Sequence, residues 1–144
     1  MDKLRYLRGR YYCLSNFGGY PVLYKGIRYK NSEAAFQSQK VLDPAVREKF
    51  ANLSPNAAKK MGRQLNLRPD WEEVKDEIME EIVRAKIDQN PEVRERLLET
   101  GDMIIEEGND WKDTYWGVDL KTGKGENHLG KILMKIRDEV RNGK

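Results

Sequence analysis

The sequence is poor in the two residue types that most often build disulfide frameworks and zinc centres. It has one cysteine and one histidine among 144 residues. A single cysteine, Cys13, excludes an internal disulfide, and one histidine in addition leaves too few ligands for a typical zinc site. We therefore expect a fold that is stable without covalent cross-links, and a site that holds no metal.

Long hydrophobic runs are also missing. No stretch approaches the roughly 20 apolar residues that a membrane-spanning helix needs. The first ten residues, MDKLRYLRGR, lack the apolar segment and the cleavage site of a secretory signal. We therefore expect a cytoplasmic protein with no membrane partner, whose basic first ten residues form a frayed, solvated end rather than an arm that contacts phosphate.

Charge of one sign does not dominate the chain. Lysine and arginine number 27 against 24 acidic residues, and the net charge of +3 is too small to indicate a general nucleic-acid binder. A local phosphate pocket stays open. The sequence shows no linker and no repeat, so we expect one domain over residues 1–144, with its core at about 10–141. The sequence leaves the oligomeric state open.

Helix signals dominate after a short β-favouring segment. Residues 20–30 place β-favouring runs on either side of Lys25-Gly26, which predicts a small hairpin with glycine at a positive φ. Asn31 or Ser32 is expected to cap the next helix. Three further helix starts are marked by a capping residue followed by proline, at Asp43-Pro44, Ser54-Pro55 and Asn90-Pro91.

Apolar spacing predicts the two longest helices. One runs from about residue 69 to 89, and the other from about 128 to 141. Residues 103–105 and 115–117 are expected to be extended or looped. The predicted fold class is therefore mainly α, a compact single-domain multihelical fold with a small N-terminal β-hairpin. The expected core face of the first long helix consists of Trp71, Val74, Ile78, Ile82 and Ala85.

The helix predicted to begin near residue 32 carries a mixed polar face. Phe36, Gln37 and Lys40 follow Glu33 by three, four and seven residues, so the four share one face. A carboxylate in the first turn of a helix is also favoured by the helix dipole, so a purely structural role for Glu33 is equally open. Taken alone, the pattern slightly favours a solvated surface over a pocket.

Two loops combine aromatic and polar residues. For the first, Ser15-Asn16-Phe17, an ordinary turn is a more common interpretation than a ligand loop. The second, NDWKDTYWGVD at 109–119, favours base stacking for Trp116 and leaves Trp111 evenly divided between stacking and core packing. His128 is expected to cap or pack at the start of the last helix.

Short strings spread over most of the chain occur in the order found in one family. They cover about residues 10 to 140, so the chain resembles members of the NADAR family, of the YbiA-like branch. The strings are SNF at 15–17, SEAAFQSQK at 32–40, MGR at 61–63, W-x-x-V-K at 71–75, RAK, QN, LLETG, IIE, DTYWG at 113–117, GENHLG at 125–130 and ILMKIR.

The resemblance implies a hydrolase. The YbiA-like branch cleaves the N-glycosidic bond of phosphorylated early riboflavin-pathway intermediates, so the expected substrate is a small phosphorylated riboside. Other members remove ADP-ribose from guanine, which makes ADP-ribosylated nucleic acid the alternative substrate. Two non-enzymatic alternatives stay open: a module that binds ADP-ribose or a nucleotide, and a plain helical interaction domain.

The resemblance also assigns site residues. Glu33 stands at the family's helix glutamate and Asp113 at the acid of its D-x-x-WG string, so these two are the expected catalytic residues. The expected substrate-binding residues are Asn16, Phe17, Phe36, Gln37, Lys40, Arg63, Lys75, Trp116 and Asn127.

A mechanism follows as a hypothesis. Cleaving a ribose C1–N bond builds positive charge on the sugar, so Glu33 would stabilise the oxocarbenium ion or activate water. Asp113 would assist the departing base, and Lys40 and Arg63 would hold the 5′-phosphate. This scheme needs no cofactor. It does require Glu33 and Asp113 to meet in one ring-lined cavity.

Overall fold

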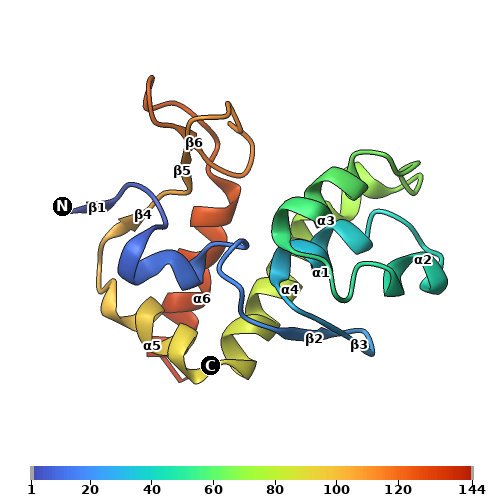
Figure 1. The fold of residues 1–144 in the computed structure, drawn as a ribbon. Coiled ribbons are helices and arrows are strands. Elements are labelled where there is room, and N and C mark those ends of the chain that lie inside the picture. Colours follow the sequence, from blue (N-terminus) through green and yellow to red (C-terminus); the bar gives the residue numbers. More distant parts are fainter. Residues whose placement is uncertain (1, 144) are drawn as a thin grey trace. The chain divides into compact units, whose positions relative to one another are not determined.

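The computed structural model describes residues 2–143, which form a mainly helical fold with a few short strands, as the sequence predicts (Figure 1). The described residues fall into two compact units. One consists of residues 16–91, and the other of residues 2–15 together with 92–143. That the whole chain acts as one domain stays a prediction.

The predicted hairpin is present in the 16–91 unit. Strands β2 (Val22–Tyr24) and β3 (Ile27–Tyr29) pair antiparallel, with Val22 opposite Tyr29. The two turn residues, Lys25 and Gly26, have φ angles of 49° and 84°. Two left-handed residues in a two-residue loop match the right-handed twist of a hairpin, which explains the glycine at 26.

Helix α1 (Ser32–Ser38) begins at the predicted cap. The Oδ1 atom of Asn31 accepts a hydrogen bond from the backbone N–H of Ala34 at 2.7 Å, and its Nδ2 donates to the carbonyl of Leu53 at 3.0 Å. The helix ends at Ser38, so Lys40 lies beyond it. The prediction that Lys40 shares a helix face with Glu33 is therefore wrong. Every residue of α1 is buried.

The cap-and-proline pairs also start helices where predicted. In the 16–91 unit they begin α2 (Pro44–Glu48) and α3 (Pro55–Gly62), and Asn90-Pro91 precedes α5 (Pro91–Glu99). Asp43 and Ser54 each accept a backbone N–H of the helix that follows. Helix α1 packs against both α3 and α4 (Figure 1).

The longest helix, α4 (Trp71–Gln89), buries a face slightly different from the predicted one. Trp71, Ile78 and Ile82 are buried as expected, whereas Val74 and Ala85 are only half-buried. The buried face turns instead toward Met79, Val83 and Ile87. The apolar spacing predicted the helix correctly. It did not predict which of two adjacent apolar faces is buried.

The second unit is built on α6 (His128–Arg141), whose bounds match the prediction. Its apolar face is buried. This unit also contains two short parallel strand pairs, which the sequence did not predict. They join β1 (Lys3–Leu4) to β4 (Ile104–Ile105), and β5 (Gly108–Asn109) to β6 (Val118–Asp119).

The expectation of a frayed N-terminal end is wrong for the described residues. After β1, Leu7 is buried and residues Gly9–Leu14 form a 3-10 helix. Arg10 forms an ion pair with Glu99, and Lys3 lies 3.4 Å from the carboxylate of Glu106. Strand pairing and a buried leucine therefore hold a segment whose basic composition suggested solvation.

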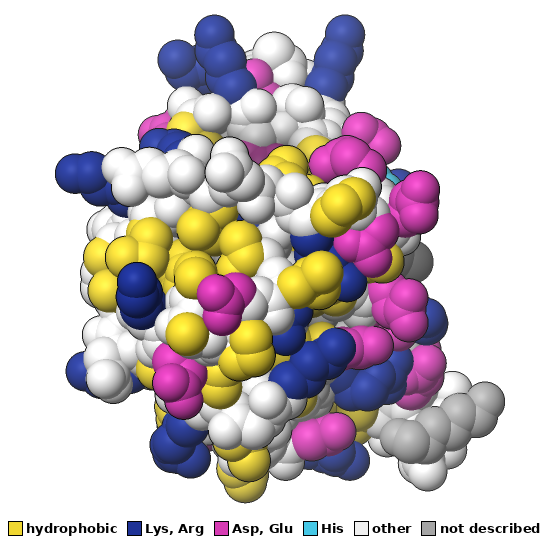
Figure 2. Space-filling view, turned by 90° about the vertical axis from the view of Figure 1, so that its right-hand side faces the viewer, with side chains coloured by type: hydrophobic (Ala, Val, Ile, Leu, Met, Phe, Trp, Pro, Cys, Tyr) yellow, Lys and Arg dark blue, Asp and Glu magenta, His cyan; other side chains and the backbone are white. Residues whose placement is uncertain are grey.

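The surface is mixed in charge. Figure 2 shows lysine and arginine side chains interspersed with acidic ones on one face, in keeping with the small net charge. Among residues 2–143, the structure contains no helix with the length and apolar character needed to cross a bilayer.

The double role of Asn31 predicts a large effect of its removal. Asn31→Ala should lower the free energy of unfolding by about 2 kcal/mol, because it deletes a cap and leaves the Leu53 carbonyl without its donor. Asp43→Ala, at an exposed cap, should cost only about 0.5 kcal/mol. Urea unfolding followed by circular dichroism measures both, and equal losses would contradict this account.

Candidate functional site

Glu33 lies in a buried environment. Its exposed fraction is 8%, and Phe36 and Gln37 on the same helix face are buried as well, while Lys40 is half-buried. The slight preference for a solvated face is therefore wrong. Because α3 and α4 both pack on α1, the polar face of this helix is turned toward protein.

A hydrogen bond links two of the predicted site residues. Nε2 of Gln37 donates to Oε2 of Glu33 at 2.7 Å, between side chains four residues apart on α1. A hydrogen bond to a carboxylate is shorter and stronger than one between neutral groups. The orientation of the Glu33 carboxylate is therefore held by its own helix.

Lys40, just beyond the end of α1, is influenced by the charges of two further cations, Arg63 and Lys59. Burial lowers the pKa of Lys40, the nearby Glu33 carboxylate opposes that effect, and the positive charges of Arg63 and Lys59 lower the pKa further. Arg63, at the C-terminal cap of α3, is exposed. The unit thus combines one buried carboxylate with several cations, an arrangement suited to an anionic substrate.

Lys59 is the cation that the sequence analysis missed. Its Nζ lies 5.8 Å from the ring centroid of Phe17, within the range of a cation–π contact. The available signal was its spacing from Arg63, since residues four apart share one face of a helix. This contact also places Phe17, a predicted binding residue, beside the cations.

Asn16 connects the loop before the hairpin to α1. Its Oδ1 accepts from the Ser32 hydroxyl at 2.9 Å, and its backbone carbonyl accepts from the N–H of Glu33 at 3.2 Å. Its Nδ2 faces the sulfur of Met79 at 3.4 Å. Asn16 therefore fixes the start of the helix that carries Glu33.

Phe36 and Lys75 make contacts of a different kind. The Phe36 ring packs on Trp71, with centroids 5.1 Å apart, so it belongs to the core between α1 and α4. Lys75 lies one turn after Trp71 on α4, and its Nζ is 2.7 Å from the Glu72 carboxylate. Substrate contact by either residue stays a prediction.

The other unit carries Asp113, whose carboxylate organises a loop. Its Oδ1 accepts from the backbone N–H groups of Tyr115 at 3.1 Å and Trp116 at 2.9 Å. The buried amide of Asn109 bonds both to the N–H and to the carbonyl of Asp113. Asp113 therefore has a structural role in this loop, as the acceptor of two backbone N–H groups.

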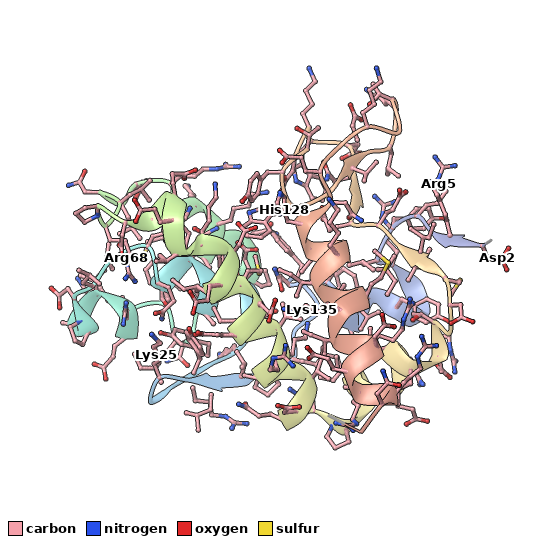
Figure 3. The ribbon with its side chains drawn as sticks, turned by 180° about the vertical axis from the view of Figure 1, so that it is seen from behind. Asp2, Arg5, Lys25, Arg68, His128 and Lys135 are labelled. Carbon is pink, nitrogen blue, oxygen red and sulfur yellow. The ribbon has the colours of Figure 1, made fainter. Side chains whose placement is uncertain are left out.

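An aromatic cluster follows that loop. Tyr115 stacks on His128 with ring centroids 4.1 Å apart, and Trp116 meets the Tyr115 ring edge-on at 4.9 Å. His128 lies in the first turn of α6, where packing was expected (Figure 3). Trp116 is half-buried and Trp111 is 51% exposed, so Trp111 does not fill the core.

Asn127 also serves its own unit. Its φ of 56° is left-handed, its Oδ1 accepts from the N–H of Glu107 at 3.0 Å, and its Nδ2 donates to the carbonyl of Ile105 at 2.8 Å. The amide predicted to bind substrate thus ties the start of α6 to the strand region.

The predicted site residues separate into two groups. The 16–91 unit brings Phe17, Glu33, Gln37, Lys40 and Arg63 together with Lys59, whereas Asp113, Trp116 and Asn127 belong to the other unit. That Glu33 and Asp113 share one cavity stays a prediction. Within the described chain, no three His, Cys, Asp or Glu side chains are grouped to hold a metal ion.

Comparison with known proteins identifies relatives over almost the whole chain. The model of the NADAR domain matches residues 5–141. The N-glycosidase YbiA of Escherichia coli is 40% identical over 129 residues, which cover 88% of this chain and 79% of YbiA. An N-glycosidase of Nostoc punctiforme is 37% identical over 138 residues, covering 92% of this chain and 87% of that protein.

The chain is also similar to a solved structure and to part of a longer protein. The NMR structure of Escherichia coli YbiA is similar with a TM-score of 0.86 at 36% identity, covering 99% of this chain and 88% of that one. A riboflavin biosynthesis protein of Vibrio vulnificus is 36% identical over 130 residues, which cover 88% of this chain but 35% of that protein.

The cation cluster predicts how Lys40 titrates. Arg63→Ala should raise the pKa of Lys40, because it removes a positive charge that disfavours the ammonium, and Glu33→Gln should lower it. Lys60→Ala is the matched control, since it removes an exposed cation of the same helix that is not among the charges shifting the pKa of Lys40. NMR titration of the lysine side chains measures the midpoints, and equal shifts in the Arg63 and Lys60 variants would refute the cluster.

Proposed function

We propose that this chain, which belongs to the NADAR family, cleaves the ribose C1–N bond of an aminopyrimidine or aminouracil ribose 5-phosphate. The chain is a hydrolase of N-glycosyl bonds, as its N-glycosidase relatives are named. The finer assignment, the phosphoribosylated base, is the proposal. On this proposal, the substrate is an early intermediate of riboflavin synthesis.

The observation that carries the proposal is the buried carboxylate of Glu33 close enough to Lys40 to affect its pKa, with the charges of Arg63 and Lys59 also acting on that lysine. A carboxylate that is 8% exposed costs free energy unless it is paired and hydrogen-bonded. Gln37 supplies the hydrogen bond and Lys40 an opposite charge. Such an arrangement suits a reaction that needs negative charge beside a phosphate-binding surface.

Glycosidic cleavage explains the carboxylate. As the C1–N bond breaks, positive charge develops on the ribose ring, and a nearby carboxylate stabilises it or takes a proton from the attacking water. Because Glu33 is largely shielded from water, its charge acts at a lower effective dielectric constant and is worth more than on a surface.

The cations account for the substrate's phosphate. Arg63 is able to bind a phosphate through two parallel hydrogen bonds, while Lys40 and Lys59 act as point charges. Their mutual repulsion in the free protein is relieved when a dianion binds between them. A phosphorylated riboside is therefore preferred over the unphosphorylated nucleoside.

The aromatic loop of the other unit is the proposed partner for the base. Trp116 offers a half-buried ring for stacking, and Asp113 is the candidate for assisting the departing nitrogen. The name of the Vibrio vulnificus relative, a riboflavin biosynthesis protein, supports a base from that pathway.

Release of the free base tests the proposal. The purified chain is incubated separately with an aminouracil ribose 5-phosphate, with the same compound lacking phosphate, and with DNA carrying ADP-ribosylated guanine. We expect base and ribose 5-phosphate from the first substrate and much slower release from the second. Release only from the modified DNA would overturn the proposed substrate in favour of an ADP-ribosyl glycohydrolase.

Removing the charge of Glu33 should abolish most of this activity. Glu33→Gln keeps the shape of the side chain, so we expect a folded protein whose kcat falls by about 100-fold or more. Glu77→Gln, at an exposed position of α4, is the control and should be fully active. A Glu33→Gln variant with normal turnover would remove Glu33 from the mechanism.

Asp113→Asn separates chemistry from loop structure. The asparagine Oδ1 can still accept the two backbone N–H groups, so the loop should persist while the acid is lost. If Asp113 assists the leaving base, kcat falls by about 100-fold with little change in thermal stability. Asp119→Asn is the matched control, because Asp119 forms a similar turn with the N–H of Lys121 at 3.0 Å. Full activity of Asp113→Asn would leave Asp113 a purely structural role.

A further inference from the structure

The nitrogen and the oxygen of the Gln37 side-chain amide have very different surroundings. The residue is 6% exposed, and its Nε2 donates to Glu33 at 2.7 Å. Its Oε1 is buried with no hydrogen-bond partner. Buried polar atoms without a partner cost free energy and are uncommon. The position of Oε1, in the amide that is bonded to Glu33, therefore requires an explanation.

Gly62, on the neighbouring helix α3, explains where that oxygen lies. A Cβ atom at position 62 would come within 1.9 Å of Oε1 and 2.7 Å of Cδ of Gln37. The amide therefore occupies the space that any larger residue would need. Gly62 is the last residue of α3 and has no positive φ, so its backbone conformation does not call for glycine.

The hydrogen bond to Glu33 decides which way the amide points. Rotating the amide by 180° would place Oε1 against the Glu33 carboxylate, and two acceptors repel each other. It would also turn the donor toward the Cα of Gly62, which cannot accept. Only one orientation keeps a donor on the carboxylate, and the close packing of α3 holds the side chain in that orientation.

We infer that Gln37 is a positioning residue that holds the Glu33 carboxylate in its ionised, productive orientation, and that glycine at 62 is required to keep Gln37 there. This role replaces the substrate contact expected for Gln37 from the sequence. Its consequence for catalysis rests on the proposed function, whereas the effect on the ionisation of Glu33 does not.

The size of the effect follows from the strength of such a bond. Losing a hydrogen bond to a charged group is expected to change a rate or equilibrium constant by a factor of roughly 10 to 100. Losing the donor disfavours the ionised carboxylate, so Glu33 should bind its proton at higher pH. The acid side of the pH–rate profile should move upward by about one pH unit or more.

Four variants test the inference: Gln37→Met, Gly62→Ala, Gln37→Ala, and Gly62→Ala combined with Gln37→Ala. Gln37→Met keeps the length and apolar body of the side chain but removes the donor. Gly62→Ala leaves Gln37 chemically intact and displaces it. The double variant Gly62→Ala with Gln37→Ala removes the clash with the amide, so the alanine at 62 should add little to the effect of Gln37→Ala alone. Thermal unfolding of each variant reports whether it is folded.

Two measurements are made on each folded variant. The first is kcat and KM against pH with an aminouracil ribose 5-phosphate, and the second is an NMR titration of the 13C-labelled Glu33 carboxyl group. We expect Gln37→Met and Gly62→Ala to lower kcat about 10- to 100-fold with KM nearly unchanged. We also expect both to move the pH midpoint of Glu33 ionisation upward.

The outcomes separate the two hypotheses. An unchanged ionisation midpoint of Glu33 in folded Gln37→Met would overturn the positioning role, whatever the activity. A large rise in KM with normal kcat would overturn it in favour of substrate contact by Gln37. If the wild-type chain releases no base while the midpoint still moves as expected, the proposed substrate fails and the positioning role stands.

Discussion

Keeping a charged carboxylate inside the protein is the constraint around which the 16–91 unit is arranged. Glu33 is 8% exposed, and burial of a lone carboxylate would shift it toward its protonated form. Two groups compensate for that burial. The Gln37 amide donates a hydrogen bond to the carboxylate, and Lys40 supplies a positive charge. An ionised group that is positioned in this way suits the stabilisation of a cationic transition state, because its orientation need not be reorganised during the reaction.

Several local features serve to position the short helix that carries this group. Asn31 caps α1, Asn16 holds the loop before the hairpin against its first turn, and Gly62 lets α3 approach closely enough to enclose Gln37. Each of these residues is ordinary by type and acts on the helix through contacts with protein. Substrate contact by Asn16 stays a prediction. The site is therefore supported by residues that a list of chemically reactive side chains would omit.

The unit formed by residues 2–15 and 92–143 follows a different principle. Its acid, Asp113, and its amide, Asn127, both bind backbone groups, so polar side chains replace regular secondary structure in shaping the aromatic loop. The stacked rings of Tyr115 and His128 then hold Trp116 edge-on. A loop shaped by side-chain hydrogen bonds can present an aromatic surface without the regular backbone pairing of a sheet. Structural and catalytic roles for Asp113 are compatible, because only its Oδ1 accepts these two backbone groups.

Local chemistry in the sequence was sufficient to determine the helix starts, the hairpin turn, the two longest helices and the mainly helical class, because caps, prolines and apolar periods act over a few residues. The same local reasoning indicated that Glu33 and Gln37 share a helix face. Tertiary packing decided what that face meets: α3 and α4 cover it, so a face that could equally have been solvated became a buried charged site. Packing also decided the parallel strand pairs, the ordered N-terminal segment and the place of Lys59 beside Phe17. Those contacts join residues far apart in the chain, and no period or motif within one segment records which distant segment will pair with it.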